Sequence, residues 1–392
     1  MYLRPLIVLI TVFSLSACES KPPTLMERHN SNVEAVNLKP FDAEARYNLG
    51  ATYLELKKHQ SAIEHFKDAV RLENKHSKAH RDLGVTYLIL KKFPEAKKSL
   101  SRSVSLDTEG TTNLINLGTL YIEMGKPKRA IRYLEKALKK NIDTAHSLNN
   151  LGVAYEQMGQ DKKAIQHWKK ALKAHPKFAD VYGNIGALYE KQGEKALALK
   201  NLEKALELNP DDAVTYYNLG VIFAKEENYK KALGYWKKSK GIDPNDAQVL
   251  NSLGGVYEKL DNKKSALEHY QLAVKADPLN AETYYNVGRM SNELGHNKEA
   301  IEAFRKTIKL DPDLIEAYYR IGFIFDNFQD GKSAIKNMII AELFYKKMKN
   351  EERIKKARRN VELLMKKYSY SARDFKTITL PDSLQGTGIL HG

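Results

Sequence analysis

One cysteine and eleven histidines supply the thiol and imidazole groups of this 392-residue sequence that could act as a nucleophile or as metal ligands. The cysteine is Cys18, and a lone thiol cannot build a disulfide, a zinc cluster or an iron–sulfur site within one chain. His76 and His80 lie four residues apart, but no acidic residue joins them in a metal-binding motif. The sequence has no P-loop, no Gly-x-Gly-x-x-Gly and no Gly-x-Ser-x-Gly. We therefore expect no catalytic residue, no metal and no cofactor.

The residues before Cys18 have the layout of a secretory signal. Arg4 supplies an early positive charge, an apolar run follows at 6–13, and Leu-Ser-Ala at 15–17 leads to the cysteine. The apolar run is too short to cross a bilayer permanently, which takes about 20 residues. Leu-Ser-Ala-Cys resembles the lipobox of bacterial lipoproteins. The resemblance implies a signal peptide at 1–17 and acylation of Cys18, for example by palmitate.

A lipidated Cys18 would place the protein in the bacterial cell envelope as a membrane-anchored lipoprotein. Several acyl chains make a stable anchor, because each buried methylene contributes ~0.8 kcal/mol. Glu19 follows the cysteine in place of the aspartate that resembles an inner-membrane retention signal, which favours the outer membrane and a periplasm-facing protein. Residues 18–24 then form a short lipidated tether. A plain cleavable signal, or a chance cysteine after an apolar start, is the alternative interpretation.

Glycine and alanine recur through most of the sequence with a period of 34 residues. The glycines are Gly50, Gly84, Gly118, Gly152, Gly186, Gly220, Gly254, Gly288 and Gly322. The alanines are Ala62, Ala96, Ala130, Ala164, Ala198, Ala232, Ala266, Ala300 and Ala334. A bulky residue follows each alanine after one helical turn: Phe66, Leu100, Leu134, Trp168, Leu202, Trp236, Tyr270, Phe304 and Met338. This pattern predicts paired helices that approach closely at the small residues and are filled by the bulky ones.

A 34-residue period with Leu-Gly-x-x-Tyr, then Ala, a bulky apolar residue and Pro resembles the tetratricopeptide repeat. It appears here as Asn-Leu-Gly-Ala-Thr-Tyr at 48–53 and Asn-Leu-Gly-Val-Ala-Tyr at 150–155. The resemblance covers residues 43–348. It implies an all-α, right-handed superhelical α-solenoid of nine helix–turn–helix repeats. Stacking of repeats supplies the core, because no single helix pair buries its apolar face alone.

The segments on either side of the repeats read as helical caps. Residues 25–42 match the end of a repeat and predict an N-terminal capping helix. Residues 349–368 are amphipathic and predict a C-terminal capping helix, and 369–392 an irregular tail. Between repeats, Asn-Pro-Asp-Asp at 209–212 and its equivalents should end one helix and cap the next.

The eighth repeat departs from the pattern at two positions. Ser291 stands where the other repeats carry an aromatic residue, and Arg289 lies two residues earlier. We expect this repeat to pack least well and to act as a hinge or as a partner contact.

Asparagine precedes the apolar–glycine pair in six repeats. These residues are Asn48, Asn116, Asn150, Asn184, Asn218 and Asn286. The family resemblance implies that they face a concave groove, similar to the asparagine ladder with which O-GlcNAc transferases grip the backbone of client proteins. An amide offers both donors and an acceptor to an extended peptide, and Tyr217, Tyr285 and Tyr319 would add aromatic side chains to the groove. Alternatively, asparagine is simply common at this position of such repeats.

The chain is basic, with 64 Lys and Arg against 48 Asp and Glu and a formal net charge of +16. Lysine pairs in the second helices should decorate the outer surface. They serve either solvation or attraction to an anionic envelope polymer or lipid head group. Because of the signal sequence, we expect no nucleic acid partner.

These features together predict a lipid-anchored scaffold or adaptor, not an enzyme, that binds proteins or extended peptide segments in its groove. Similar tetratricopeptide lipoproteins assist assembly of envelope complexes for pili, secretion or polysaccharide export. Two alternatives stay open: a cytoplasmic adaptor whose start mimics a signal, and a non-catalytic subunit of an enzyme complex.

Overall fold

The computed structural model describes residues 23–140 and 144–379. Over these ranges the chain forms twenty α-helices, one short 3₁₀ helix (η1, Ala372–Phe375) and no strand. The helices are α1 Leu25–Leu38, α2 Ala43–Glu55, α3 His59–Leu72, α4 Ser77–Ile89, α5 Phe93–Leu106, α6 Thr111–Glu123, α7 Pro127–Leu138, α8 Thr144–Gln157, α9 Asp161–Ala174, α10 Ala179–Lys191, α11 Lys195–Leu208, α12 Ala213–Lys225, α13 Tyr229–Ile242, α14 Ala247–Lys259, α15 Lys263–Ala276, α16 Ala281–Glu293, α17 Asn297–Leu310, α18 Ile315–Asn327, α19 Gly331–Lys347 and α20 Glu351–Lys367. The expected signal peptide at 1–17 and the lipidation site Cys18 lie outside the described residues.

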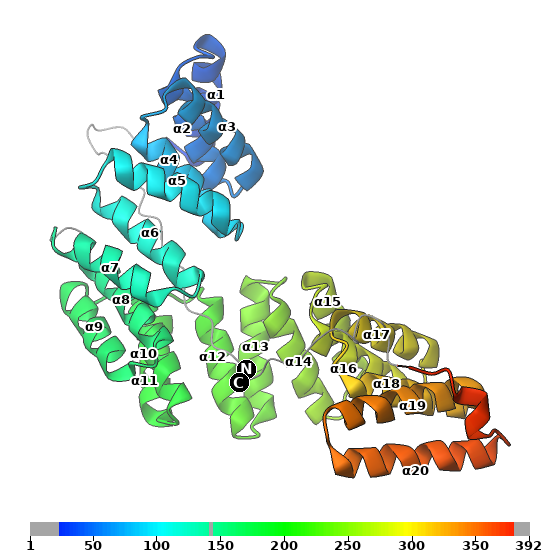
Figure 1. The fold of residues 1–392 in the computed structure, drawn as a ribbon. Helices are drawn as coiled ribbons and strands as arrows, with labels where there is room; N and C mark the ends of the chain where they lie inside the picture. The colour runs from blue at the N-terminus through cyan, green and yellow to red at the C-terminus, as the bar shows by residue number, and fades with distance from the viewer. Residues whose placement is uncertain (1–22, 141–143, 380–392) are drawn as a thin grey trace. The chain divides into compact units, whose positions relative to one another are not determined.

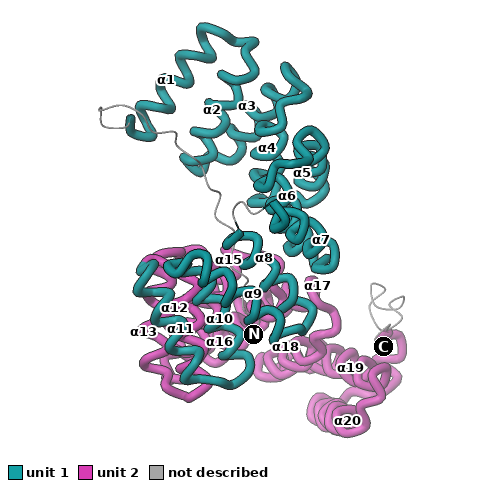
Figure 2. The backbone as a smooth tube through the Cα atoms, turned by 90° about the vertical axis from the view of Figure 1, so that its left-hand side faces the viewer, with its two compact units in different colours: residues 1–210 teal, residues 211–392 magenta. Residues whose placement is uncertain are grey.

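The chain divides into two compact units, drawn in different colours in Figure 2. Unit 1, Met1–Pro210, contains α1–α11, and unit 2, Asp211–Gly392, contains α12–α20. Within each unit the helices follow one another as hairpins that stack side by side (Figure 1). We call the first helix of each hairpin helix A (α2, α4 and so on to α18) and the second helix B (α3 to α19). The predicted all-α solenoid is confirmed.

Each hairpin is closed by contact between the repeating glycine of helix A and the bulky residue of helix B. A Cβ atom added at Gly152 would lie 2.3 Å from Nε1 of Trp168, and one at Gly50 would lie 2.8 Å from the Phe66 ring. The other seven repeats pair the same two positions. The nine alanines of helix B are completely buried. The small residues are therefore required by the close approach of the helices, as their spacing predicts.

The turn from helix A to helix B uses a left-handed backbone conformation in all nine repeats. Four repeats place glycine there, and five place a residue with a side chain, with φ between 56° and 58°. The glycines are Gly125, Gly159, Gly193 and Gly295, and the other residues are Lys57, Lys91, Glu227, Asp261 and Gln329. This conformation satisfies carbonyl groups at the helix C-terminus and normally favours glycine.

The boundaries between repeats follow the expected capping chemistry. In unit 2, α13 ends at Ile242 before proline, and Asp246 caps α14 by accepting from the backbone N–H groups of Gln248 and Val249. Asn280 caps α16 in the same way. Each cap satisfies N–H groups that have no partner inside the helix.

The two end helices lie within the ranges expected for capping helices. Thr24 and Glu27 form a capping box at the start of α1, and α20 lies beside α19 (Figure 1). The tail after α20 differs from the irregular segment expected at 369–392. Residues 372–375 form η1, and the Phe375 ring is buried against the end of unit 2. An aromatic residue near the open end of the stack covers apolar surface that no further repeat covers.

Candidate functional site

The six asparagines of the predicted ladder divide into a buried and a half-buried set. Asn150, Asn184 and Asn218 are 1%, 7% and 1% exposed. Asn48, Asn116 and Asn286 are half-buried. Only the half-buried asparagines offer their amides to a ligand without rearrangement. The asparagine ladder as a ligand contact therefore stays a prediction, and it now concerns Asn48, Asn116 and Asn286.

The buried asparagines of unit 1 connect successive helices A. Asn184 of α10 donates from Nδ2 to Oδ1 of Asn149 in α8 at 3.0 Å. Asn149 donates in turn to Oδ1 of Asn150 at 3.2 Å. Asn150 donates to Oγ1 of Thr119 in α6 at 3.0 Å. The chain of bonds runs through three repeats and satisfies amides that would be costly to bury alone.

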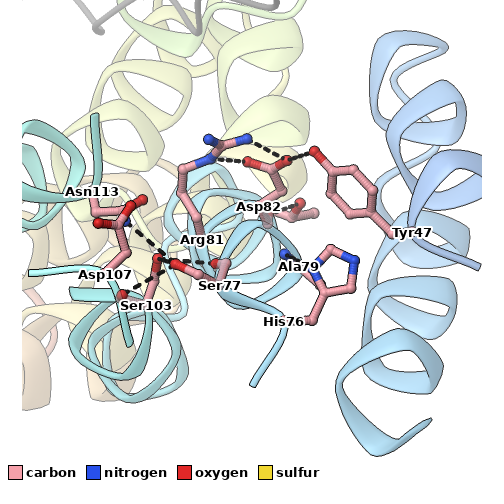
Figure 3. Close-up of polar contacts among 10 residues, drawn as sticks. Tyr47, His76, Ser77, Ala79, Arg81, Asp82, Ser103, Asp107 and Asn113 are labelled. Carbon is pink, nitrogen blue, oxygen red and sulfur yellow. Dashed lines mark hydrogen bonds and ion pairs between the residues drawn. The ribbon is translucent and has the colours of Figure 1, made fainter. Parts of the chain in front are cut away.

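The same connection is made by charged groups in the first two repeats (Figure 3). Tyr47 of α2 donates its hydroxyl hydrogen to Oδ2 of Asp82 in α4 at 2.9 Å. Arg81 holds both oxygens of this carboxylate, at 2.6 and 2.9 Å. Burial and then the Asp82 charge raise the pKa of Tyr47 above its usual range. Asp82 occupies the ladder position of the second repeat, so this position is again bonded to the preceding helix A, here as the acceptor.

A second polar cluster in Figure 3 joins α4, α5 and α6. Ser103 donates to the backbone oxygen of Ser77 at 3.0 Å, and Asn113 donates to Oδ2 of Asp107 at 3.2 Å. Asn113 and Ser103 are buried. The cluster fixes the second repeat against the third and has no arrangement suited to catalysis.

The tyrosines expected in the groove serve mainly in packing. Tyr217 is 6% exposed and accepts a hydrogen bond from Nε2 of Gln248 at 2.9 Å. Tyr319 is 7% exposed and accepts one from Asn360 of α20. Tyr285 is half-buried, with its ring 5.6 Å from that of Phe304. Of the three, Tyr285 is the one whose surface is available.

The eighth repeat is joined to the seventh by an ion pair of Arg289. Arg289 binds both oxygens of Glu258 in the preceding helix A, at 2.5 and 2.6 Å. The Arg289 hydrogen bonds hold the pKa of Glu258 below its ordinary value. Ser291 is fully buried. The arginine that departs from the pattern therefore links two repeats.

Ring pairs between helix A and helix B fill the hairpins in five repeats. Their members are 12 residues apart: Tyr53 with His65, Tyr121 with Tyr133, Tyr155 with His167, Phe223 with Tyr235, and Tyr257 with His269. Their ring centroids are separated by 5.0 to 5.5 Å. The sequence contains this signal as a spacing of 12 residues, which the 34-residue period alone does not reveal.

The histidine pair noted in the sequence has a structural role. His76 accepts a bond from the backbone N–H of Ala79 and so caps α4, and its Nε2 lies 3.1 Å from a carboxylate oxygen of Glu44. The acidic neighbour that the local motif lacks comes from the preceding repeat.

Among the residues that the structure describes, no three His, Cys, Asp or Glu side chains are grouped to hold a metal ion. Nor is any described helix long and apolar enough to span a bilayer.

Sequence profiles of known families match the repeats directly. Four profiles described as tetratricopeptide or TPR repeat match residues 43–76, 112–139, 156–193, 179–212, 201–234, 247–278 and 288–326. Together these matches cover more than half of the chain. The chain belongs to the tetratricopeptide repeat family. Proteins of this family generally act by binding other proteins.

Solved tetratricopeptide structures resemble this one to different extents. The Cut9 complex with Hcn1 of the APC/C aligns over 85% of this chain and 83% of its own, with 16% identity and a TM-score of 0.51, which bears on the fold alone. MamA aligns over 44% of this chain and 94% of its own, with 26% identity and a TM-score of 0.41. PilF of Pseudomonas aeruginosa aligns over 57% and 98%, with 22% identity and a TM-score of 0.48. No curated protein sequence matches the chain.

Proposed function

We propose that this protein is a lipid-anchored adaptor that binds protein partners or extended peptide segments along its helices A, in the assembly of a bacterial envelope complex. The observation that carries the proposal is the regular stack itself. Glycine and bulky residues close each hairpin, so successive hairpins present their outer side chains at regular intervals. Such a surface suits a long ligand that contacts several repeats.

The half-buried amides are the groups that would bind such a ligand. Asn48 and Asn116 lie on α2 and α6 of unit 1, and Asn286 lies on α16 of unit 2 beside the partly open ring of Tyr285. Each amide can donate to a backbone carbonyl and accept from a backbone N–H. Neighbouring buried amides hold the helices in register, which reduces the entropy lost when the ligand is bound.

The anchor rests on the sequence at 15–18 and on the position of Cys18 after an apolar run. A lipidated N-terminus holds the adaptor at the outer membrane, where its partners would be components of a pilus, secretion or polysaccharide-export machine. The tether between Cys18 and α1 is short, so the repeats stay close to that membrane.

The test of the anchored adaptor is crosslinking of the natively expressed protein, followed by mass spectrometry of the captured partners, beside a Cys18→Ser control. We expect envelope proteins to be captured by the native form and depleted in the control. Cytoplasmic partners captured equally by both forms would replace the envelope assignment with an adaptor that has no anchor.

The ligand contact is tested by two matched asparagine substitutions in unit 1. Asn116→Ala removes a half-buried amide, and we expect weaker partner capture with unchanged thermal stability. Asn150→Ala removes a buried amide bonded to Thr119 and Asn149, and we expect it to lower the free energy of unfolding by about 1–3 kcal/mol. Unchanged capture by a folded Asn116→Ala protein would remove this residue from the binding surface.

A further inference from the structure

A cleft of about 940 Å³ opens in unit 1 between the helices B of the first two repeats. Its walls come from α3 and α5, and α4 lies beneath. We call it the Ser99 cleft, after a 7% exposed serine on α5 that lines it. The cleft lies on the helix B side and uses none of the ladder asparagines.

The Ser99 cleft is hollow because a ring is missing. Ser99 occupies the helix B position that His65, His167 and His269 occupy in other repeats, where an aromatic ring packs on the helix A tyrosine. Tyr87, the helix A partner of Ser99, is present and lines the cleft. A side chain from outside can therefore take the place that a histidine ring takes elsewhere.

The floor of the Ser99 cleft is apolar and its rim is basic. Val70, Leu83 and Tyr87 form apolar parts of the lining. Lys67, Lys98 and Arg102 also line the cleft. Within the described parts of the chain these three cations form no ion pair. Unpaired cations around a desolvated apolar floor favour an acidic ligand by charge complementarity.

A second cleft, in unit 2, provides an internal comparison. It has a volume of about 610 Å³ and lies at the equivalent place between α15 and α17, where both Ala303 and its helix A partner Ser291 lack a ring. Glu95 of the Ser99 cleft and Glu299 of this cleft are equivalent, but Glu302 stands at the position of Lys98, so the unit 2 lining sets two carboxylates against the basic residues of α17. Both units thus have a hollow at this place, and the Ser99 cleft has the larger excess of cations, with Lys67, Arg71, Lys98 and Arg102 against Glu95.

We propose that the Ser99 cleft binds an acidic peptide segment of a protein partner. One apolar side chain of the segment inserts against Val70, Leu83 and Tyr87, and carboxylates on both sides of it contact the three cations of the rim. The cleft is thus a second partner site, independent of the helix A surface. A phosphate-rich polymer or a lipid head group would supply the anions, but it carries no compact apolar group for the floor.

The test uses a fluorescein-labelled peptide, Asp-Glu-Asp-Leu-Phe-Asp-Glu-Asp, titrated with the purified full chain and followed by fluorescence anisotropy. Ser99→His fills the cleft with the residue that three other repeats tolerate, and we expect at least tenfold weaker binding. Ala303→His adds a ring at the equivalent position of unit 2, where Ser291 stands in place of the tyrosine, and should leave the affinity unchanged. Circular dichroism melting of each variant shows that it is folded.

Charge and ligand class are tested in the same assay. Lys98→Glu places the unit 2 residue in the Ser99 cleft and should weaken binding by about fivefold or more, whereas Lys169→Glu, the same charge change at an exposed site of α9 outside the cleft, should have no effect. Weakening by Lys98→Glu without weakening by Ser99→His would mean general attraction to the basic surface, and would overturn the proposal. Two further results would overturn the proposal. One is that the peptide does not bind; the other is that phosphatidylglycerol vesicles bind and that Ser99→His weakens vesicle binding as strongly as peptide binding.

Discussion

The second and fourth repeats differ in what fills the space between their helices. In the fourth, His167 stacks on Tyr155 at 5.1 Å, and Trp168 lies against Gly152 and donates to the backbone oxygen of Asn149 at 3.1 Å. In the second, the same two adjacent positions are Ser99 and Leu100, and a cleft opens beside them. The third repeat also has leucine at the second position, yet Tyr133 fills its hairpin, so the residue at the Ser99 position marks the difference between a filled and a hollow hairpin.

The largest expected effect comes from giving the fourth repeat the smaller residue of the second. Trp168→Leu removes a fully packed ring and its hydrogen bond, and we expect a loss of about 2–4 kcal/mol in the free energy of unfolding, since large-to-small core changes leave a cavity. Hydrogen exchange of α8 and α9 measures it locally. Protection equal to that of the unaltered chain would show that the ring adds no stability to this hairpin.

The next effect comes from overfilling the same hairpin. Gly152→Ala places a Cβ 2.3 Å from the Trp168 ring, and overpacking of this kind costs about 1–3 kcal/mol. Gly234→Ala, at an exposed site of α13 with no atom within 4 Å of the added Cβ, should instead stabilise its helix by about 0.5–1 kcal/mol. Chemical denaturation of both variants checks the opposite signs, and equal signs would contradict the close-approach explanation.

Filling the hollow repeat should have a smaller, favourable effect. Ser99→His completes the ring pair with Tyr87, and stacked aromatic pairs contribute about 0.5–1.5 kcal/mol beyond their buried area. The melting temperature should therefore rise slightly even as peptide binding is lost. A lower melting temperature would mean that the space is too small for the ring, and the comparison between the two repeats would fail.

The smallest effect is a pH dependence of the filled repeats. Burial lowers the pKa of His65, His167 and His269 below the ordinary value of about 6.5. The unfolded chain then binds more protons than the folded one, so stability present at pH 7.5 is lost as the pH falls through the depressed pKa values. We expect His167→Tyr, which copies Tyr133 of the third repeat, to reduce the loss of stability between pH 7.5 and 5. An equal loss in the variant would exclude His167 as a contributor.

The sequence predicts the hairpins because their closure depends on residue type at fixed positions. The 34-residue period identifies Gly152 and Trp168 as a contacting pair. The boundary between repeats likewise identifies Asp246 as the cap of α14. The environment of the ladder was not predictable from that period alone. Asn184 is buried because it bonds to Asn149, 35 residues earlier, and this contact depends on how one helix A leans on the next.

The clefts were missed for a related reason. A hollow is produced by the absence of a side chain, and Ser99 looks like an ordinary surface serine until its position is compared with His65 and His167. The relevant signal is a pair 12 residues apart in which one member has become small. With that spacing in mind, Ser99 is visible in the sequence opposite Tyr87, and Ala303 is visible opposite Ser291, but the basic rim around Ser99 requires the arrangement of α3 and α5.

The left-handed turns between helix A and helix B are positions at which substitution to glycine could raise the free energy of unfolding. Five of the nine are made by residues with side chains, and the left-handed conformation costs such a residue about 1–2 kcal/mol relative to glycine. None of these five positions lines the Ser99 cleft or belongs to the asparagine ladder. An engineer could therefore make the repeats more resistant to heat one turn at a time, at Lys57, Lys91, Glu227, Asp261 and Gln329, without altering what the protein recognises.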